Sequence, residues 1–147
     1  MNHPPRSGSQ RRVLIVGGVA GGASCAARLR RLDESADIAI FDRGPYVSFA
    51  NCGLPYYVGN IIADERALLV ASRETFRDRF NIDVFTDTEV TGIDRDAHTI
   101  TLRDVHSDSR RTERYDVLVL SPGAAPPSVH VHGSDRSAGR LPPSQGC

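Results

Sequence analysis

One cysteine in a polar, turn-rich segment is the residue of this chain whose setting best suits chemistry. Cys52 lies in the stretch SFANCGLPYY, among small and polar residues and just before a glycine and a proline. The thiolate form of a cysteine attacks disulfides, and backbone N–H groups at a helix start stabilise it. A short helix beginning at Asn51–Cys52, with Pro55 in its first turn, would supply such groups. The alternative is that Cys52 is a buried structural thiol.

A glycine turn upstream is the second candidate site. In RVLIVGGVAGGASCAA an apolar, β-branched run leads into glycines that open a helix. The first N–H groups of a helix lack partners and carry partial positive charge, so a pyrophosphate fits there. The dinucleotide fingerprint G-x-G-x-x-G is met imperfectly, because Val19 takes the place of its middle glycine. The predicted cofactor-binding residues of the turn are Gly17, Gly18, Val19, Ala20, Gly21 and Gly22.

Asp42 extends this second site, because it ends the next predicted strand about 20 residues after the glycines. A carboxylate at that place accepts hydrogen bonds from the hydroxyls of a nucleotide ribose. The alternative is a turn that uses glycine only for tight packing, with Asp42 as a solvated strand end. The strand, turn, helix and acidic residue together favour the nucleotide.

The helix after the glycine turn has two distinct stripes. The apolar stripe is expected to pack against a sheet, which makes Cys25 a small core residue rather than a reactive thiol. Its members are Cys25, Ala26, Leu29 and Leu32. The polar stripe is either a grip for a second, phosphorylated ligand or a solvated basic face. Its members are Ser24, Arg28 and Arg31.

An α/β fold with a parallel sheet is predicted to position these residues. Short apolar runs predict its strands at 12–16, 37–42, 82–86 and 116–120. Helices are expected over 23–34 and over 72–80, the latter with Ser72 as its N-cap. Polar residues alternate with β-branched ones over 88–115, which predicts an antiparallel β-meander with one exposed face. This is the pattern of a Rossmann-like dinucleotide-binding domain.

Composition excludes several other classes of protein. The 18 basic residues balance 18 acidic ones and Trp is absent, so neither a charge field nor a stacking surface for nucleic acid is expected. The three cysteines are widely spaced and form no Cys/His grouping, which argues against a disulfide framework or a metal site. No apolar run is long enough for a membrane span, so we expect a cytoplasmic protein without a membrane partner. A disordered tail is expected at 1–11 and an irregular one at 127–147.

Three segments carry a specific resemblance to a known family. They are VLIVGGVAGGASCAARLRRLDE, IFDRGPYVSFANCGLPYYVGN and YDVLVLSPGAAP. Together they resemble the N-terminal part of the coenzyme A-disulfide reductases, a single-cysteine branch of the flavin-dependent pyridine nucleotide-disulfide oxidoreductases. The resemblance covers residues 12–126. Its S-F-x-x-C-x-x-P-Y pattern matches at Ser48, Phe49, Cys52, Pro55 and Tyr56.

The resemblance implies that residues 12–126 form an FAD/NAD(P)-binding domain, with FAD pyrophosphate on the glycine turn and its adenosine ribose on Asp42. It implies that Cys52 cycles between a thiolate and a mixed disulfide with CoA. Because no CxxC pair is present, the partner sulfur must come from substrate, or Cys52 must form a sulfenic acid. Matched positions imply that CoA contacts Ser24, Arg28, Arg31, Ser48 and Asn51, which favours the phosphate grip over the solvated face.

The family continues beyond the matched part, with a second Rossmann domain for NAD(P)H, a return segment and a C-terminal domain for homodimerisation. The sequence after Pro126 does not resemble that continuation, so we expect a truncated or frameshifted N-terminal half without the dimerisation domain. The expected function is that of an FAD-dependent NAD(P)H:disulfide oxidoreductase acting on CoA disulfide. The alternatives are a relative of the NADH oxidases, NADH peroxidases or polysulfide reductases, and a non-catalytic nucleotide-binding remnant.

Overall fold

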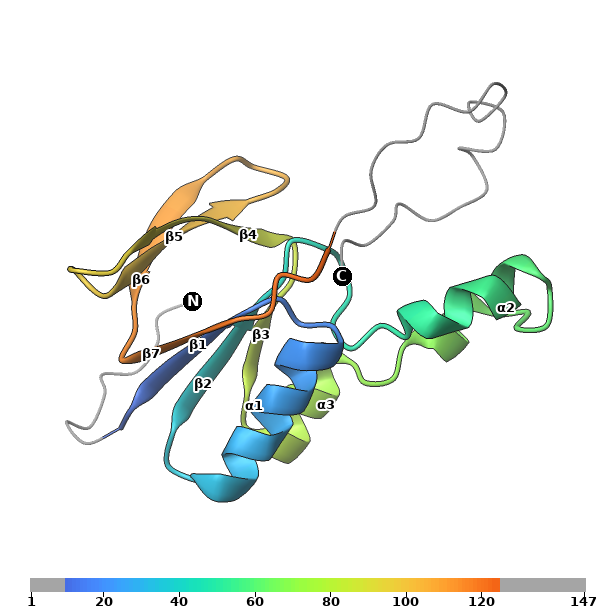
Figure 1. The fold of residues 1–147 in the computed structure, drawn as a ribbon, viewed down its shortest axis with the longest axis horizontal. Helices are drawn as coiled ribbons and strands as arrows, with labels where there is room; N and C mark the ends of the chain where they lie inside the picture. Colours follow the sequence, from blue (N-terminus) through green and yellow to red (C-terminus); the bar gives the residue numbers. More distant parts are fainter. Residues whose placement is uncertain (1–9, 125–147) are drawn as a thin grey trace.

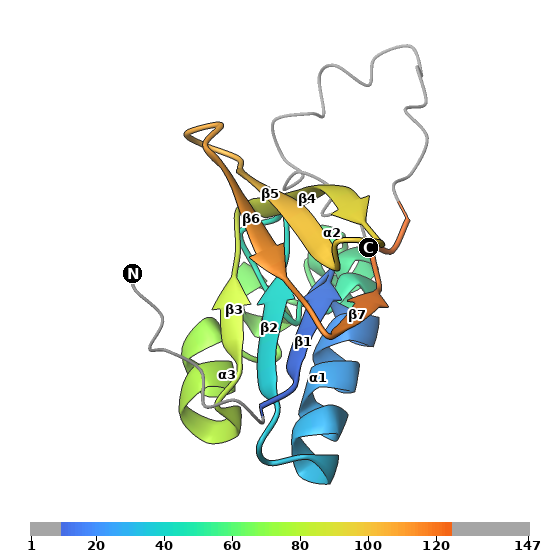
Figure 2. The same ribbon diagram turned by 90° about the vertical axis from the view of Figure 1, so that its left-hand side faces the viewer.

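The computed structural model describes residues 10–124, which form three layers (Figure 1 and Figure 2). The middle layer is a parallel sheet in the order β3-β2-β1-β7, and its strands are β1 Arg12–Val16, β2 Asp37–Phe41, β3 Asp83–Phe85 and β7 Val117–Leu120. Helices α1 Ala20–Leu32 and α3 Arg73–Phe80 cover one face. The antiparallel sheet of β4 Thr88–Asp94, β5 Thr99–Asp104 and β6 Arg110–Arg114 covers the other. The predicted α/β fold with a parallel sheet and a meander is confirmed.

Alternation along the central strands builds two cores. Successive side chains of a strand point to opposite faces, so a strand covered on both sides is apolar throughout. Val13 and Ile15 of β1 pack on the helix side with Phe76 of α3. Leu14, between them, packs on the meander side with Leu102 of β5. The RVLIV run therefore connects all three layers.

The register of the parallel strands brings three chain segments to one edge of the sheet. Val16 of β1 is aligned with Phe41 of β2 and with Leu120 of β7. The residues that follow these strand ends, Gly17, Asp42 and Ser121, therefore arrive together. Backbone hydrogen bonds support the alignment, because the Gly17 amide donates to the Phe41 carbonyl and the Ser121 amide to the Val16 carbonyl, both at 2.8 Å.

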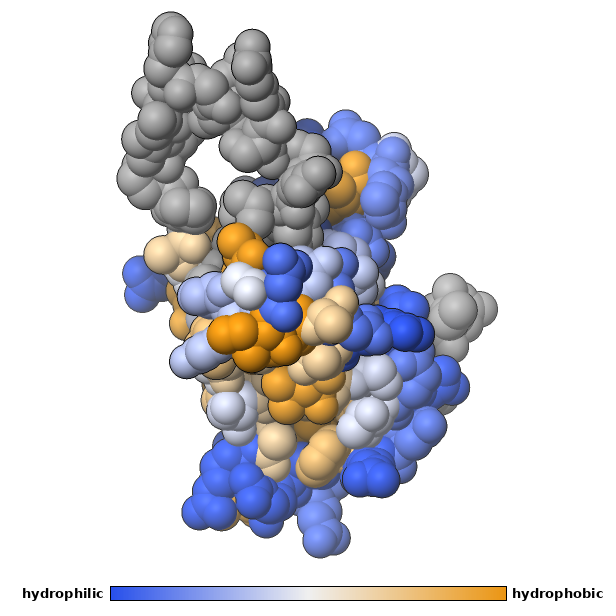
Figure 3. Space-filling view, turned by 90° about the vertical axis from the view of Figure 1, so that its right-hand side faces the viewer, coloured by the Kyte–Doolittle hydropathy of each residue, from blue (hydrophilic) through white to orange (hydrophobic). Residues whose placement is uncertain are grey.

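Short helical turns form within and after the turn-rich segment that contains Cys52. They are the 3₁₀ turn η1 Asn51–Gly53, the helix α2 Leu54–Val58 and the 3₁₀ turn η2 Glu65–Leu68. Figure 3 shows an apolar patch on the face toward which α2 projects. Exposed apolar side chains of this region are Tyr56, Val58, Ile61 and Val70.

Two expectations about α1 are wrong. The helix begins at Ala20, inside the glycine turn, rather than at residue 23. Its buried face also differs from the apolar stripe, because Leu32 is 68% exposed and Cys25 is only half-buried. Arg30 is buried instead, since its long apolar stem lies against the protein while its head reaches polar groups.

Arg30 joins the ends of the two helices. Its Nε donates to the Phe80 carbonyl and its Nη2 to the Asn81 carbonyl, both at 2.8 Å, at the end of α3. Its Nη1 donates to the Glu34 carbonyl at 2.6 Å, just past the end of α1. Helix ends leave carbonyl groups without intrahelical partners, and a cation suits the negative end of the helix dipole.

Replacing Arg30 with methionine is expected to lower the free energy of unfolding by about 3 kcal/mol, because several carbonyls lose a charged donor. Urea denaturation of the purified chain measures this loss. Arg31→Met is the matched control, since Arg31 is exposed and its change should stay within about 0.5 kcal/mol. Equal losses in both variants would contradict the assigned role of Arg30.

The predicted tails fall outside the described part of the chain, apart from residues 10 and 11. The expected end of the domain at residue 126 also lies outside it. Over residues 10–124 the structure contains no helix that is both long enough and apolar enough to span a membrane.

Candidate functional site

Two cavities flank the glycine turn at the edge where the strands end. The larger, about 660 Å³, is called the thiol cavity because Cys52 lines it. The smaller, about 300 Å³, is called the Asp42 cavity. Both are lined by Val19, Ser121 and Gly123, so they meet across the glycine turn. A ligand with two bulky halves joined by a narrow link suits such a pair of cavities.

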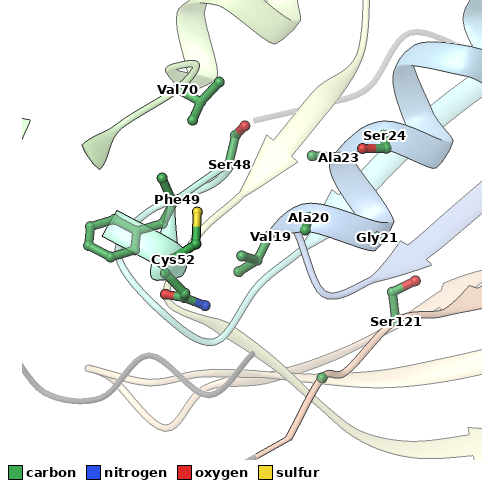
Figure 4. A pocket seen from close by; sticks show the side chains of 13 residues that line it. Val19, Ala20, Gly21, Ala23, Ser24, Ser48, Phe49, Cys52, Val70 and Ser121 are labelled. Carbon is green, nitrogen blue, oxygen red and sulfur yellow. The ribbon is translucent and has the colours of Figure 1, made fainter. Parts of the chain in front are cut away.

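In the thiol cavity, Cys52 and Ser48 lie on one side and the first turns of α1 on the other (Figure 4). Cys52 is exposed and its thiol is free, so the alternative of a buried structural thiol is wrong. The predicted short helical start at Asn51–Cys52 is present as η1, and it continues into α2 with Pro55 in the first turn. Proline is accepted there because the first N–H groups of a helix need no intrahelical partner.

The backbone of Ser48 ties the Cys52 segment to the rest of the site. Ser48 has a left-handed conformation with φ of 54°. Its amide donates to the Gly18 carbonyl at 2.7 Å, and its own carbonyl accepts from the Val70 amide at 3.0 Å. The Phe49 side chain is buried and stacks on Tyr46 at 6.0 Å between ring centroids. The segment that leads to Cys52 is thus joined to the glycine turn through Ser48.

The glycine turn shows which glycines the fold requires. Gly17 has φ of 91°, which favours glycine, and a Cβ on Gly22 would overlap the Gly17 carbonyl oxygen. Val19 has a negative φ of −83°, so the backbone conformation at the middle place of the fingerprint does not require glycine. The first turn of α1 has no side-chain cap and no acidic residue. Its N–H groups and its dipole therefore remain available for an anion.

Asp42 is buried and lines the cavity named after it. Its Oδ2 accepts from the Gly18 amide at 2.7 Å and its Oδ1 from the Gly44 amide at 2.8 Å. The alternative of a solvated strand end is wrong. Glu89 lines the same cavity and is paired with Arg103 at 2.5 Å, and this hydrogen bond raises the pKa of Arg103.

The predicted CoA-contacting residues fall into two groups. Ser24, Ser48 and Asn51 line the thiol cavity together with Cys52. Arg28 and Arg31 line neither described cavity and are exposed on α1, one and two turns beyond Ser24. The roles of all five residues remain predictions.

Sequence reasoning missed Ser121 and Gly123, which line both cavities, and Val70, which lines the thiol cavity. Ligands of α/β proteins bind beyond the carboxyl ends of the strands. That rule pointed to the residues after the predicted strand 116–120, and applying it there would have found Ser121.

The carboxyl groups of the described residues whose pKa is shifted line neither cavity. Hydrogen bonds to the ionised form lower the pKa of four carboxyl groups, Asp33, Asp64, Glu74 and Asp104. For Asp104 the largest cause is the Ser107 amide, which donates at 2.7 Å. Within residues 10–124 no group of three His, Cys, Asp or Glu side chains is arranged to hold a metal.

Fold and site together define a dinucleotide-binding domain whose exposed thiol shares a cavity with the glycine turn. The chain belongs to the pyridine nucleotide-disulphide oxidoreductase family, whose model matches residues 11–144. Members of this family are flavin-dependent enzymes that use FAD and NAD(P)H.

Relatives and solved structures agree with this assignment. The chain is 42% identical to the coenzyme A disulfide reductase of Staphylococcus epidermidis over 121 residues. This matched stretch is 82% of this chain and 28% of that protein. It superposes on reduced Bacillus anthracis CoADR-RHD with a TM-score of 0.80 and 48% identity, covering 86% of this chain and 23% of the other. It superposes on a NAD-dependent persulfide reductase from A. fulgidus with a TM-score of 0.76 and 37% identity, covering 83% of this chain and 23% of the other. The chain thus spans less than a third of the length of these proteins.

Proposed function

We propose that this chain supplies the FAD-binding and thiol-bearing part of an NAD(P)H-dependent reductase of CoA disulfide. The observation that carries the proposal is the thiol cavity, in which the exposed Cys52 lies opposite the first turn of α1. Similarity to coenzyme A disulfide reductases favours CoA disulfide over polysulfide, peroxide or oxygen as the electron acceptor. A cytoplasmic location, where thiols stay reduced, belongs to the same proposal.

The residues present fit FAD. A pyrophosphate at the start of α1 would lie where the two cavities meet, because Val19, Ser121 and Gly123 line both. The absence of side chains at Gly17 and Gly22 lets the turn lie close to Ser121 and to the start of α1, which aligns the first N–H groups of α1 for a pyrophosphate. Asp42 would hold the adenosine ribose, and the thiol cavity would take the flavin half. Bound there, FAD would supply electrons in pairs for the reduction of a sulfur on Cys52.

Cys52 is the nucleophile in this proposal. Its thiolate attacks one sulfur of CoA disulfide, the S–S bond breaks, and one CoA leaves as a thiolate. The new bond is a mixed disulfide between Cys52 and the second CoA. Two electrons and a proton then release that CoA and restore the Cys52 thiolate. NAD(P)H is the proposed source of the electrons in the whole protein, which we propose to be a homodimer like its family.

CoA carries phosphate groups as well as its sulfur, so its binding needs both polar and cationic contacts. Ser24, Ser48 and Asn51 offer hydrogen-bonding groups around the thiol. Arg28 and Arg31 follow Ser24 on the exposed face of α1, where guanidinium groups suit phosphate. The polar stripe of α1 is therefore proposed to lead from the thiol to the phosphates of CoA.

The test has two parts and uses the purified chain. The chain is first incubated with FAD and freed of excess cofactor, and a flavin absorbance band is expected to remain with the protein. It is then exposed to CoA disulfide, and mass spectrometry is expected to find one CoA on the peptide that contains Cys52. A colourless protein without CoA labelling would support the non-catalytic remnant. Labelling by CoA disulfide should also exceed oxidation of Cys52 by hydrogen peroxide, whereas the reverse would favour a peroxidase or oxidase relative.

A further inference from the structure

We propose that the peptide groups on either side of Gly18 transmit a displacement of Asp42, in one cavity, to Ser48 in the other. Asp42 is then a positioning residue for the segment that carries Cys52. This role is additional to any contact between Asp42 and a ribose. The coupling itself depends only on the described contacts, and only its response to ligand rests on the proposed function.

A continuous chain of hydrogen bonds connects the two cavities. Oδ2 of Asp42, in the Asp42 cavity, accepts from the Gly18 amide at 2.7 Å. The Gly18 carbonyl accepts from the Ser48 amide at 2.7 Å, and Ser48 lines the thiol cavity. The Ser48 carbonyl accepts from the amide of Val70, which also lines the thiol cavity, at 3.0 Å. Gly18 thus has one hydrogen bond toward each cavity.

Gly18 has little room to move independently of its neighbours. A Cβ at this position would come within 3.0 Å of methyl groups of Ile40 and Val47 and within 3.4 Å of Oδ2 of Asp42. The backbone of Gly18 therefore lies close to buried side chains, and buried packing of this kind allows few alternative positions. A shift at the Asp42 carboxylate should for that reason reach the Gly18 carbonyl rather than be absorbed locally.

The backbone of Ser48 is the part of the thiol cavity that would move when the Gly18 carbonyl shifts. Its left-handed backbone, with φ of 54°, is costly for a residue other than glycine and persists only where its surroundings hold it. The two backbone hydrogen bonds to Gly18 and Val70 provide that hold. The hydrogen bond from Gly18 to Asp42 is short, at 2.7 Å, and buried, so losing it would leave the Gly18 amide without a partner away from water. Asp42 thereby stabilises the Ser48 conformation, and Cys52 follows four residues later.

Asp42→Asn is the substitution that tests the coupling. The asparagine keeps the shape of the side chain but replaces one acceptor oxygen with a donor, so it cannot accept from both Gly18 and Gly44. Asp37→Asn is the matched control. Asp37 lies at the other end of the same strand and accepts from Nη1 of Arg12 at 2.5 Å, so it also loses a charged hydrogen bond.

The readout is amide hydrogen exchange at Ser48 and Val70, followed by NMR. Asp42→Asn is expected to speed both exchange rates about tenfold relative to the wild-type chain, whereas Asp37→Asn should change them less than about twofold. Exchange of the Ile40 amide in β2 reports on global opening and corrects for it. Equal effects of the two substitutions at Ser48 after this correction would overturn the coupling. A second readout is alkylation of Cys52 by iodoacetamide, with Cys25 in the same chain as the internal reference.

ADP, which carries the ribose and diphosphate but no flavin, separates this inference from the proposed function. ADP bound at the Asp42 cavity is expected to shift the resonances of Glu89 and Val90 and to slow exchange of the Ser48 amide about threefold or more. Shifts at Glu89 and Val90 with unchanged exchange at Ser48 would overturn the coupling but not nucleotide binding. Absence of any shift would overturn the proposed function, and the Asp42→Asn comparison would then decide the coupling alone. The ADP arm on the wild-type chain also decides the coupling if the Asp42→Asn variant does not fold.

Discussion

Replacing Cys52 with serine is expected to reduce mixed-disulfide formation with CoA disulfide to the level of a protein-free blank. A serine hydroxyl is not ionised near neutral pH, so it cannot replace a thiolate as the attacking group. Binding of FAD should stay within about threefold of the wild-type value, because one oxygen for one sulfur at an exposed side chain changes the cavity little. The reaction is followed by mass spectrometry of the intact chain after incubation with CoA disulfide.

Cys25→Ser is the matched control for this experiment. Cys25 is a free, half-buried thiol on α1, and its substitution should leave CoA labelling within about twofold. The assignment of the nucleophile would be wrong if the Cys52→Ser chain still acquired CoA as quickly as the wild-type chain. In that event, the labelled peptide would identify which of the other two cysteines reacts.

The layers of the fold could be predicted because each leaves its own period in the sequence. Residues 13–16 of the RVLIV run are all apolar, as expected of a strand covered on both faces, and β1 is covered on both faces. The meander alternates, and β5 has the buried residues Ile100 and Leu102 two apart. Ser72 caps α3 as predicted, since its side chain accepts from the Thr75 amide. These signals are local, so one sequence is enough to see them.

The errors arose where a contact joins distant parts of the chain. Leu32 was assigned to the buried stripe from its spacing, but α1 ends there and no layer covers it. Arg30 was assigned to neither stripe, because the Phe80 and Asn81 carbonyls that it contacts lie about 50 residues away at the end of α3. Hydropathy and spacing do not reveal such long-range contacts. Ser121 is a different case, because its place just after the predicted strand 116–120 could have been found, and the register of β7 beside β1 brings it to the site.

The sequence predicted which residues form the candidate site better than it predicted the contacts that each of them makes. Asp42, Ser48, Cys52 and four residues of the glycine turn line two adjoining cavities, whereas Gly18 and Gly22 line neither. The sequence could not show that Asp42 accepts from Gly18, because that hydrogen bond depends on how the turn folds back over β2. It also could not rank the glycines, whereas the positions of neighbouring backbone atoms do so directly.

Gly22→Ala is therefore expected to abolish FAD retention and to destabilise the chain by about 2 kcal/mol. Its Cβ would overlap the carbonyl oxygen of Gly17 and come within 3.1 Å of the Ile15 side chain. Gly17 cannot withdraw, because its amide is bonded to the Phe41 carbonyl and its φ of 91° already favours glycine alone. The start of α1 must then separate from the turn, and the N–H groups that would bind a pyrophosphate lose their alignment.

Gly21→Ala supplies the matched control one residue away. Its Cβ would lie 3.4 Å from Oγ of Ser121, which is ordinary van der Waals contact, and Gly21 has no positive φ. We expect its thermal unfolding to match the wild-type chain or to improve slightly, because alanine favours the helix over glycine by about 1 kcal/mol. Its FAD affinity, measured by quenching of flavin fluorescence, should stay within about tenfold of the wild-type value. If Gly22→Ala retained FAD as well as Gly21→Ala does, close approach of the turn to α1 would not be what binds the cofactor, and the pyrophosphate would have to be placed elsewhere.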